Sequence, residues 1–210
     1  MPSQPITEEQ FKQLLQETKK EKNKFIQRRD SLMYKILYHL GLRPGECRLI
    51  ELSHLNFKEQ TLFIPAKNNK ERQEDEVWFP DFLMFDIKKY LQERGVNSRW
   101  LFPGGLNKAR NQDVPVDSRT TQFKFSERMK SLGFMQLSYY DKSNNPHYTL
   151  NLYSFRKRFG TFIYIKTRDP KITANLLRHY DKELKSVWSY VFFAEKGERK
   201  QLMQQIYENL

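Results

Sequence analysis

The sequence predicts a mainly α-helical domain with a small antiparallel β hairpin or three-stranded sheet, which is an α+β fold class. Apolar residues recur at helical spacing along most of the 210-residue chain. Two short segments rich in β-branched and aromatic residues, 61–66 and 77–79, are typical of paired strands. Hydrophobic residues make up 38% of the chain and aromatic residues 14%, which argues for a packed core and against disorder.

The amino-terminal part predicts two helices. Thr7 and Gln10 are spaced as a capping box ahead of an apolar stripe, and the charged run 19–24 is expected to be solvated. We expect Asp30 to cap the second helix and Gly41 to end it.

Arg43 follows this helix in the segment GLRPGE. Pro44 and Gly45 indicate a tight junction between two helices, where a long side chain is held by backbone on both sides. Two interpretations stay open at this point. Arg43 either bridges the junction to Glu46, or it reaches a bound group.

A charged segment starting at Lys67 separates the two predicted strands, and it is either a solvated loop or the carrier of a mobile lysine. Helices are expected over 80–94 and 118–132, with a loop over 106–117. We expect a polar loop over 138–149, since Pro146 disfavours a helix there.

The stretch 151–190 carries the residues on which the functional hypothesis depends. Tyr153 and Arg156 are three apart on a predicted helix, so both can reach one bound group. Asp169 and Pro170 predict the start of a short helix that ends near His179. In a third helix we expect Leu184, Val187, Trp188 and Val191 to face inward and Tyr190 to face a cleft. An arginine, a histidine and a tyrosine from three helices suggest a phosphodiester site.

Gly197 is expected to break the chain before a terminal helix over 198–210. The apolar stripe of that helix is too short to stand alone. It is expected either to dock on a neighbouring protomer or to pack back on its own domain.

The charge balance favours a polyanionic partner. Lys and Arg number 37 against 25 Asp and Glu, a formal net charge of +12, which favours nucleic acid over a membrane surface. No apolar run approaches the roughly 20 residues of a membrane-spanning helix. The single cysteine, Cys47, excludes an internal disulfide and a cysteine-rich zinc site, and we expect a cytoplasmic, DNA-associated protein.

Five sequence elements, in order, resemble the catalytic domain of the tyrosine recombinase (phage integrase) family. GLRPGE is similar to the first arginine motif and points to Arg43 with Glu46. TLFIPAKNNKERQEDEVWFP is similar to the lysine hairpin and points to Lys67. YSFRKRFGTFIY is similar to the second arginine motif, LLRH to the histidine element, and Tyr190 takes the position of the nucleophile.

The chain departs from the family pattern in three places. Tyr153 stands where the family usually has histidine or lysine, and Arg178 stands in place of a glycine before His179. The spacing from His179 to Tyr190 is longer than usual. Tyr180 and Tyr207 are the alternative tyrosines, and we expect neither to be the nucleophile.

The resemblance implies cutting and rejoining of DNA through a 3′-phosphotyrosine at Tyr190, with no metal and no ATP. Arg43 and Arg156 would hold the phosphate, Lys67 would act as general acid, and His179 would bind the phosphate or ease the tyrosine proton off. Tyr153 would hydrogen-bond the phosphate. The partners implied are double-stranded DNA and other protomers assembled on it. We expect residues 1–210 to be a single catalytic domain without the family's amino-terminal core-binding domain.

Basic residues expected to contact the DNA backbone are Arg72, Lys108, Arg110, Lys124, Arg128, Lys157, Arg158 and Lys166. Two rival functions are a non-catalytic DNA-binding protein that kept the fold, and a type IB topoisomerase or telomere resolvase. The aromatic and glycine signatures of common RNA-binding modules are missing from the sequence.

Overall fold

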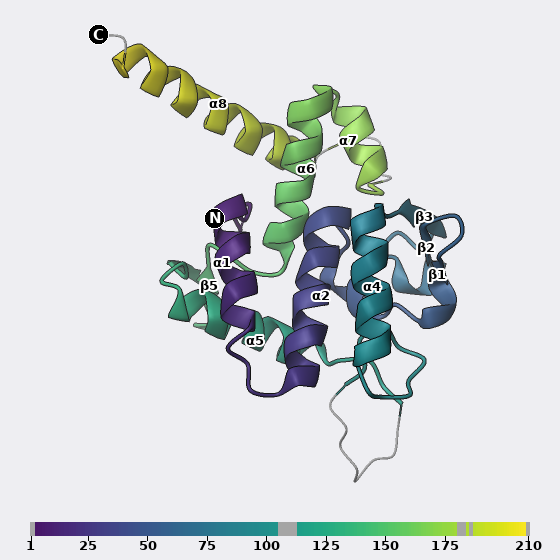
Figure 1. Cartoon of the computed structure of the whole chain (residues 1–210). Helices are drawn as coiled ribbons and strands as arrows, with labels where there is room; N and C mark the ends of the chain where they lie inside the picture. Colours follow the sequence, from purple (N-terminus) through teal and green to yellow (C-terminus); the bar gives the residue numbers. More distant parts are fainter. Residues whose placement is uncertain (1–2, 105–112, 180–183, 185–186, 209–210) are drawn as a thin grey trace.

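The computed structural model describes residues 3–104, 113–179, 184 and 187–208, with the backbone alone at 200 and 202–208 (Figure 1). The helices are α1 (Glu8–Thr18), α2 (Lys24–Leu40), α3 (Pro44–Arg48), α4 (Asp81–Glu93), α5 (Ser118–Ser131), α6 (Tyr153–Thr167), α7 (Pro170–Leu176) and α8 (Trp188–Glu208). The strands are β1 (Leu55–Asn56), β2 (Thr61–Ile64), β3 (Asp75–Trp78), β4 (Leu137–Tyr140) and β5 (Pro146–Tyr148). The predicted mainly helical α+β fold is confirmed.

The capping signals of the first two helices have different outcomes. Thr7 and Gln10 form the predicted capping box of α1. The prediction that Asp30 caps α2 is wrong, because the side chain of Asn23 caps that helix. Asp30 lies buried inside α2 and accepts hydrogen bonds from Arg29 and from Arg128, a partner remote in sequence.

The main core forms between α2, α5 and α6. Phe155 of α6 stacks on Tyr34 of α2, with ring centroids 5.8 Å apart, and meets Phe125 of α5 edge-on at 5.6 Å. All three rings are buried. Their packing fixes α6, the helix that carries Arg156, against α2.

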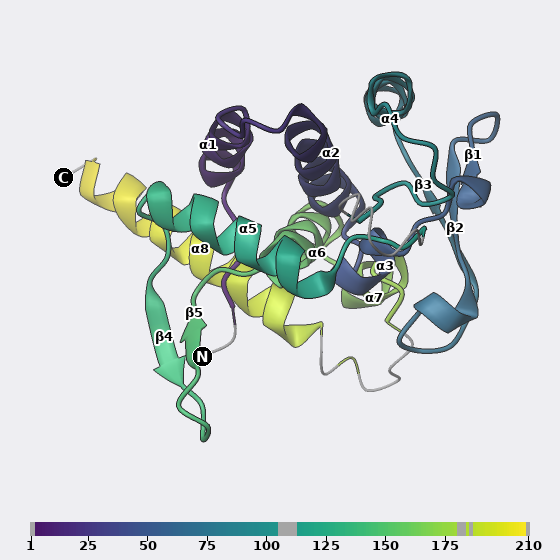
Figure 2. The same ribbon diagram turned by 90° about the horizontal axis from the view of Figure 1, so that it is seen from below.

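The three-stranded sheet has the order β1-β2-β3 and is antiparallel throughout, with Leu62 opposite Val77. It lies at the end of the molecule opposite the carboxyl terminus of α8 (Figures 1 and 2). Leu62 and Ile64 are buried, as alternation along a half-buried strand requires. The predicted strand over 61–66 ends at Ile64, because Pro65 has no N–H to donate to the ladder.

The prediction of a loop over 138–149 is wrong, because β4 and β5 form a hairpin there that projects from the helices (Figure 2). Asp141 organises its turn by accepting hydrogen bonds from the backbone N–H groups of Ser143 and Asn145. Pro146 pairs with Tyr140 at the start of β5, a strand position that proline tolerates.

Gly197 does not break the chain. It lies within α8, which runs on to Glu208 and extends away from the body (Figure 1). Of the residues predicted to face inward here, Val187 and Val191 are buried, whereas Trp188 is 56% exposed. The side chains of the terminal segment lie largely outside the described residues.

No helix in the described ranges has the length and apolar character needed to cross a bilayer.

Candidate active site

A cavity of about 520 Å³ lies where α3, the β2–β3 connection, α6, the end of α7 and α8 meet. Its lining residues are Arg43, Lys70, Glu71, Tyr153, Arg156, Lys157, His179 and Tyr190. Arginine and lysine side chains outnumber the single carboxylate, so the cavity suits an anion. The structure therefore brings together all the side chains predicted as catalytic except Lys67.

Glu46 holds Arg43 at the N-cap of α3. Its carboxylate accepts hydrogen bonds from the Arg43 backbone N–H at 2.8 Å and from Nη1 at 2.7 Å. Burial alone raises the pKa of Glu46, but the charge of Arg178 and the hydrogen bonds from Arg43 outweigh it and lower that pKa. Of the two interpretations of Arg43, the bridge to Glu46 is present, and it aims the guanidinium at the cavity.

The β2–β3 connection supplies further partners to Arg43. Asn69 is buried and its Oδ1 accepts from Nη1 at 3.3 Å. Glu71 Oε1 accepts from Nη2, also at 3.3 Å. One edge of the guanidinium is therefore occupied by a carboxylate that the protein itself supplies.

Arg156 is 3% exposed and reaches the cavity from α6. Its Nη1 donates to the carbonyl of Gly41 at 2.8 Å, and its Nη2 donates to the carbonyl of Leu177. Gly41 ends α2 with φ of 59°, as predicted, and so turns that carbonyl toward Arg156. Burial, followed by the charges of Arg43 and Arg178, lowers the pKa of Arg156 to about 10, so it stays protonated at neutral pH.

The hydrogen bonds around His179 identify its tautomer. Nε2 lies 3.3 Å from Arg156 Nη2 and 3.2 Å from Tyr190 Oη. A guanidinium only donates, so Nε2 carries a lone pair and accepts from both groups. Burial, followed by the charge of Arg156, lowers the pKa of His179 to about 3, so the ring is neutral at pH 7.

Tyr190 sits at the start of α8 and is 5% exposed. The glycine at position 160 of α6 makes room for its ring. A Cβ on Gly160 would lie 2.9 Å from Tyr190 Cγ and 2.8 Å from Leu177 Cδ1, closer than ordinary contact. Gly160 therefore allows α8 to approach α6 until the Tyr190 hydroxyl reaches His179.

Lys67 lies apart from the cavity. Its side chain is 71% exposed, and Nζ is 3.9 Å from Glu51 Oε1. The lysine of the same connection that lines the cavity is Lys70. Sequence reasoning missed Lys70 and Glu71 as site residues, although KNNKER in the charged connection was the available signal.

Two further predicted residues line the cavity from α6. Tyr153 is 52% exposed, so its hydroxyl is open to a ligand. Lys157 is half-buried, with Nζ 5.3 Å from the centre of the Phe193 ring, and burial lowers its pKa. Of the predicted DNA contacts within the described residues, Lys157 is the one that lines this cavity.

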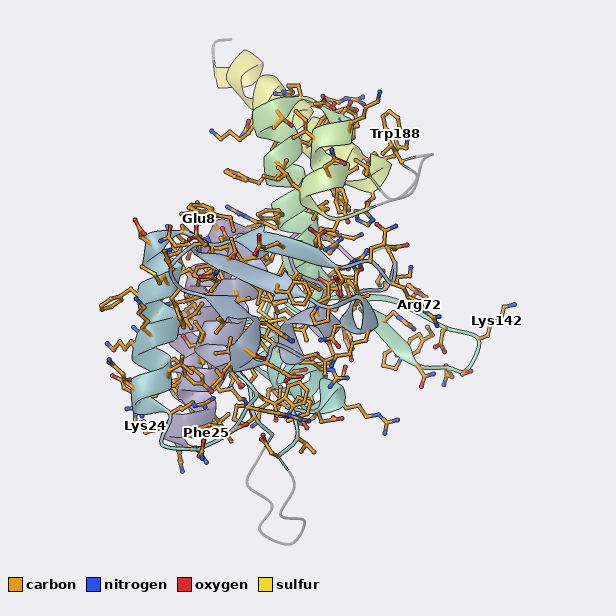
Figure 3. All side chains as sticks on the ribbon, turned by 90° about the vertical axis from the view of Figure 1, so that its right-hand side faces the viewer. Glu8, Lys24, Phe25, Arg72, Lys142 and Trp188 are labelled. Atoms are coloured by element: carbon orange, nitrogen blue, oxygen red, sulfur yellow. The ribbon has the colours of Figure 1, made fainter. Side chains whose placement is uncertain are left out.

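The remaining predicted DNA contacts are dispersed. Arg72 is exposed on the β2–β3 connection (Figure 3), and Lys166 is exposed near the end of α6.

Other predicted DNA contacts are engaged with the protein itself. The guanidinium of Arg158 lies over the Tyr38 ring at 4.0 Å, and Lys124 pairs with Glu21 and Glu127. Arg128 is 7% exposed and donates to Asp30 and Tyr34, so it is a core residue. Lys108 and Arg110 lie outside the described residues.

The described part of the chain contains no group of three or more His, Cys, Asp and Glu side chains placed to hold a metal ion.

Comparison with known sequences identifies relatives of this chain. Residues 4–195 match the model of the family described as "Phage integrase family". Tyrosine recombinase XerA of Pyrococcus horikoshii is 26% identical over 164 residues, covering 78% of this chain and 50% of the relative. Tyrosine recombinase XerC of Mannheimia succiniciproducens is 25% identical over 196 residues, covering 92% of this chain and 58% of the relative. The chain spans about half the length of these relatives.

Solved structures share the fold. A crystal structure of XerA recombinase superposes with a TM-score of 0.70 at 15% identity, covering 98% of this chain and 66% of the other. The XerH recombinase bound to a palindromic difH substrate, a post-cleavage complex, also gives 0.70, at 18% identity, covering 99% of this chain and 54% of the other. At these identities the likeness concerns the fold.

Proposed function

The chain belongs to the phage integrase family, the tyrosine recombinases, and on that premise we propose that it cuts and rejoins double-stranded DNA in site-specific recombination, through a 3′-phosphotyrosine at Tyr190. One observation carries the proposal. The Tyr190 hydroxyl lies 3.2 Å from a neutral histidine nitrogen, which in turn lies 3.3 Å from a buried arginine, all at one basic cavity. A nucleophile, a proton acceptor and a phosphate-binding cation are thus within reach of one phosphate.

The proposed step exchanges one phosphodiester for another. Tyr190 Oη bonds to phosphorus while the bond from phosphorus to the 5′ oxygen breaks. The phenolic proton passes to His179 Nε2, and a lysine gives a proton to the departing 5′ oxygen. A 5′ hydroxyl of another strand then attacks the phosphotyrosine and releases Tyr190. Because the covalent link keeps the energy of the broken bond, no ATP is needed.

The low pKa of His179 suits a base that acts only on bound substrate. In the empty site the surrounding positive charges oppose a proton on the ring. A phosphate bound between Arg43 and Arg156 brings negative charge beside the imidazole and raises its pKa. His179 therefore becomes a better proton acceptor when DNA occupies the cavity.

The Glu71 carboxylate accepts from the Arg43 guanidinium and so competes with a DNA phosphate for it. The variant Glu71→Gln is therefore expected to bind DNA more tightly. Gln keeps the size of Glu71 and removes a negative charge 3.3 Å from Arg43 Nη2. A partly exposed pair of this kind is worth up to about 1 kcal/mol, so we expect a gain of roughly two- to five-fold in affinity. Fluorescence anisotropy with a labelled duplex measures it. Glu74→Gln, an exposed carboxylate of the same connection, is the control, and a gain no larger than in this control would contradict the role of Glu71.

We propose Lys67 as the general acid and expect Lys67→Ala to slow cleavage by about 10²- to 10⁴-fold. Its long, exposed contact to Glu51 opposes movement into the cavity only weakly. A DNA with sulfur in place of the bridging 5′ oxygen should restore the rate, because a thiolate leaves without a proton. Lys70→Ala, expected to weaken DNA binding instead, is the matched comparison. If the sulfur-containing DNA restored the cleavage rate of Lys70→Ala and not that of Lys67→Ala, the general acid would be Lys70.

The other proposed partner is a second protomer on the same DNA. The first turns of α8 pack on α6, with Val191 and Ala194 buried, and the rest of the helix extends beyond the body (Figure 1). Relatives in this fold include a lambda integrase dimer bound to a core site. We propose that the distal part of α8 contacts a neighbouring protomer, and that Lys157, Arg72 and Lys166 contact the DNA backbone.

A suicide DNA substrate, nicked so that the 5′ fragment diffuses away after cleavage, tests the proposed function. The expected product is a denaturant-resistant protein–DNA adduct whose linked residue, identified by mass spectrometry, is Tyr190. DNA binding without an adduct would favour a non-catalytic DNA-binding protein. Relaxation of supercoiled plasmid without strand exchange would favour a type IB topoisomerase.

A further inference from the structure

Arg178, directly before His179, is an arginine in an unfavourable place. Its φ is 55°, in the left-handed region where a side chain is disfavoured relative to glycine. Its side chain is 3% exposed, and burying a guanidinium is costly unless it is well paired. Backbone strain and a buried charge thus coincide at the residue next to His179, which lines the candidate active site, and such strain is found most often at functional sites.

The pairing of Arg178 joins separate parts of the site. Nη2 donates to Glu46 Oε2 at 2.8 Å, and Nε lies 4.0 Å from Asp75 Oδ2. Glu46 is the residue that holds Arg43, and Asp75 begins β3, the strand after the lysine-bearing connection. Arg178 thereby links the peptide of His179 to α3 and to the sheet.

Arg178 also changes the charge balance around Arg43. The Glu46 carboxylate accepts from both guanidinium groups, so Arg43 and Arg178 share its one negative charge. Paired with Arg43 alone, Glu46 would neutralise it. With Arg178 present, Glu46 therefore opposes the attraction of Arg43 for an anionic ligand less strongly.

We propose that Arg178 is a positioning residue for DNA cleavage, which acts through Glu46 and Asp75 to hold Arg43 and His179 in one geometry around the phosphate. The inference rests on the proposed function and assigns a role to a residue that the chain has in place of the family's glycine.

A purely structural role is a poor explanation of this arginine. Nε and Nη1 are buried and have no hydrogen-bond partner among the described residues. An arginine kept only for stability would be better satisfied. Loss of the Arg178 side chain leaves Glu46 paired with Arg43, so no carboxylate of α3 becomes a buried, unpaired charge. Arg178→Met is therefore expected to fold, and Arg178→Gly removes the strain at positive φ as well.

The pH dependence of cleavage separates positioning from packing. Within the described ranges, the charged and titratable groups that act on His179 include Arg43, Lys70, Arg156, Arg178 and Tyr190. Positive charge near the imidazole lowers its pKa and keeps it neutral to lower pH. Removal of the Arg178 charge raises that pKa, so protonation of His179 sets in at higher pH. The acid limb of the cleavage profile should move upward in Arg178→Met and stay in place in Arg178→Lys.

The experiment measures single-turnover adduct formation from the suicide substrate between pH 5 and 9, with thermal unfolding of each variant. We expect Arg178→Met and Arg178→Gly to cleave about 10- to 100-fold more slowly at pH 7, as for a displaced catalytic group. Arg178→Lys should recover a large part of the rate. Arg29→Met is the matched control, because Arg29 is also buried and shares one carboxylate, Asp30, with a second arginine. It should lose stability without a shift of the acid limb.

Two results would overturn the inference. Wild-type rate and pH profile in Arg178→Met would show that Arg178 positions nothing. A loss of rate that follows only the loss of folded protein, as in Arg29→Met, would assign Arg178 to packing. Absence of an adduct from the wild-type chain is a different failure, since it would overturn the proposed function and this inference with it.

Discussion

Replacing Tyr190 with phenylalanine is expected to abolish the covalent adduct with DNA while the fold persists. Phenylalanine keeps the ring that packs beside Gly160 and Leu177, and removes the hydroxyl that lies 3.2 Å from His179 Nε2. Loss of a nucleophile costs on the order of 10⁴- to 10⁶-fold in rate. The lost hydrogen bond costs only about 1 kcal/mol of stability. Gel analysis of the suicide-substrate reaction and thermal unfolding measure the two effects.

Two other tyrosines make the test specific. Tyr180 and Tyr207 are the alternative nucleophiles that the sequence offers, and phenylalanine at either position should leave adduct formation intact. DNA affinity should change little in all three variants, since phosphate contacts elsewhere carry binding. An adduct that persists in Tyr190→Phe and disappears in Tyr180→Phe or Tyr207→Phe would move the nucleophile to that residue.

The second large effect is expected at Arg156. Arg156→Lys keeps the positive charge but loses the planar fork that spans Gly41, Leu177 and His179. Removing one preorganised donor to a developing negative charge costs about 10²- to 10³-fold in rate. We therefore expect single-turnover cleavage to fall by that factor, with DNA affinity nearly unchanged.

The unfolding temperature separates the proposed catalytic role of Arg156 from its structural role as a donor to the carbonyls of Gly41 and Leu177. Arg156→Ala leaves two buried carbonyls without a donor, at about 1–3 kcal/mol each, so its unfolding temperature should fall well below that of Arg156→Lys. If Arg156→Lys cleaved at the wild-type rate, the guanidinium would serve only to tie α2 and the end of α7 to α6.

Local signals explain which parts of the fold could be predicted from sequence. The capping box at Thr7, the stop at Gly41 and the start of α7 at Asp169 each depend on residues a few positions apart, and all three are confirmed. The signal at Asp30 was equally local but misleading, because its carboxylate pairs with Arg128, far along the chain. Polar composition likewise concealed the β4–β5 hairpin, whose strands are stabilised by pairing with each other.

The residues of the candidate site also divide into those that local sequence patterns identify and those that only contacts between distant segments place there. Order and spacing along the chain were enough to name Arg43, Arg156, His179 and Tyr190, because motifs are one-dimensional patterns. They could not show that Lys70 and Glu71 line the cavity while Lys67 lies outside it. The path of a connection between two strands depends on contacts to α3 and to Arg43 that no local pattern records.

The amino-acid sequence by itself determined the helical periodicity, the basic character and the side chains that we propose to bind and attack a phosphate. Only the tertiary structure decided the low pKa of His179, the contact of Glu71 with Arg43 and the contacts of Arg178 with Glu46 and Asp75. The physical reason is that a charge responds to burial and to neighbours within a few ångströms. Those neighbours come from α3, the β2–β3 connection, α6, the end of α7 and α8, which lie together in space and far apart in sequence.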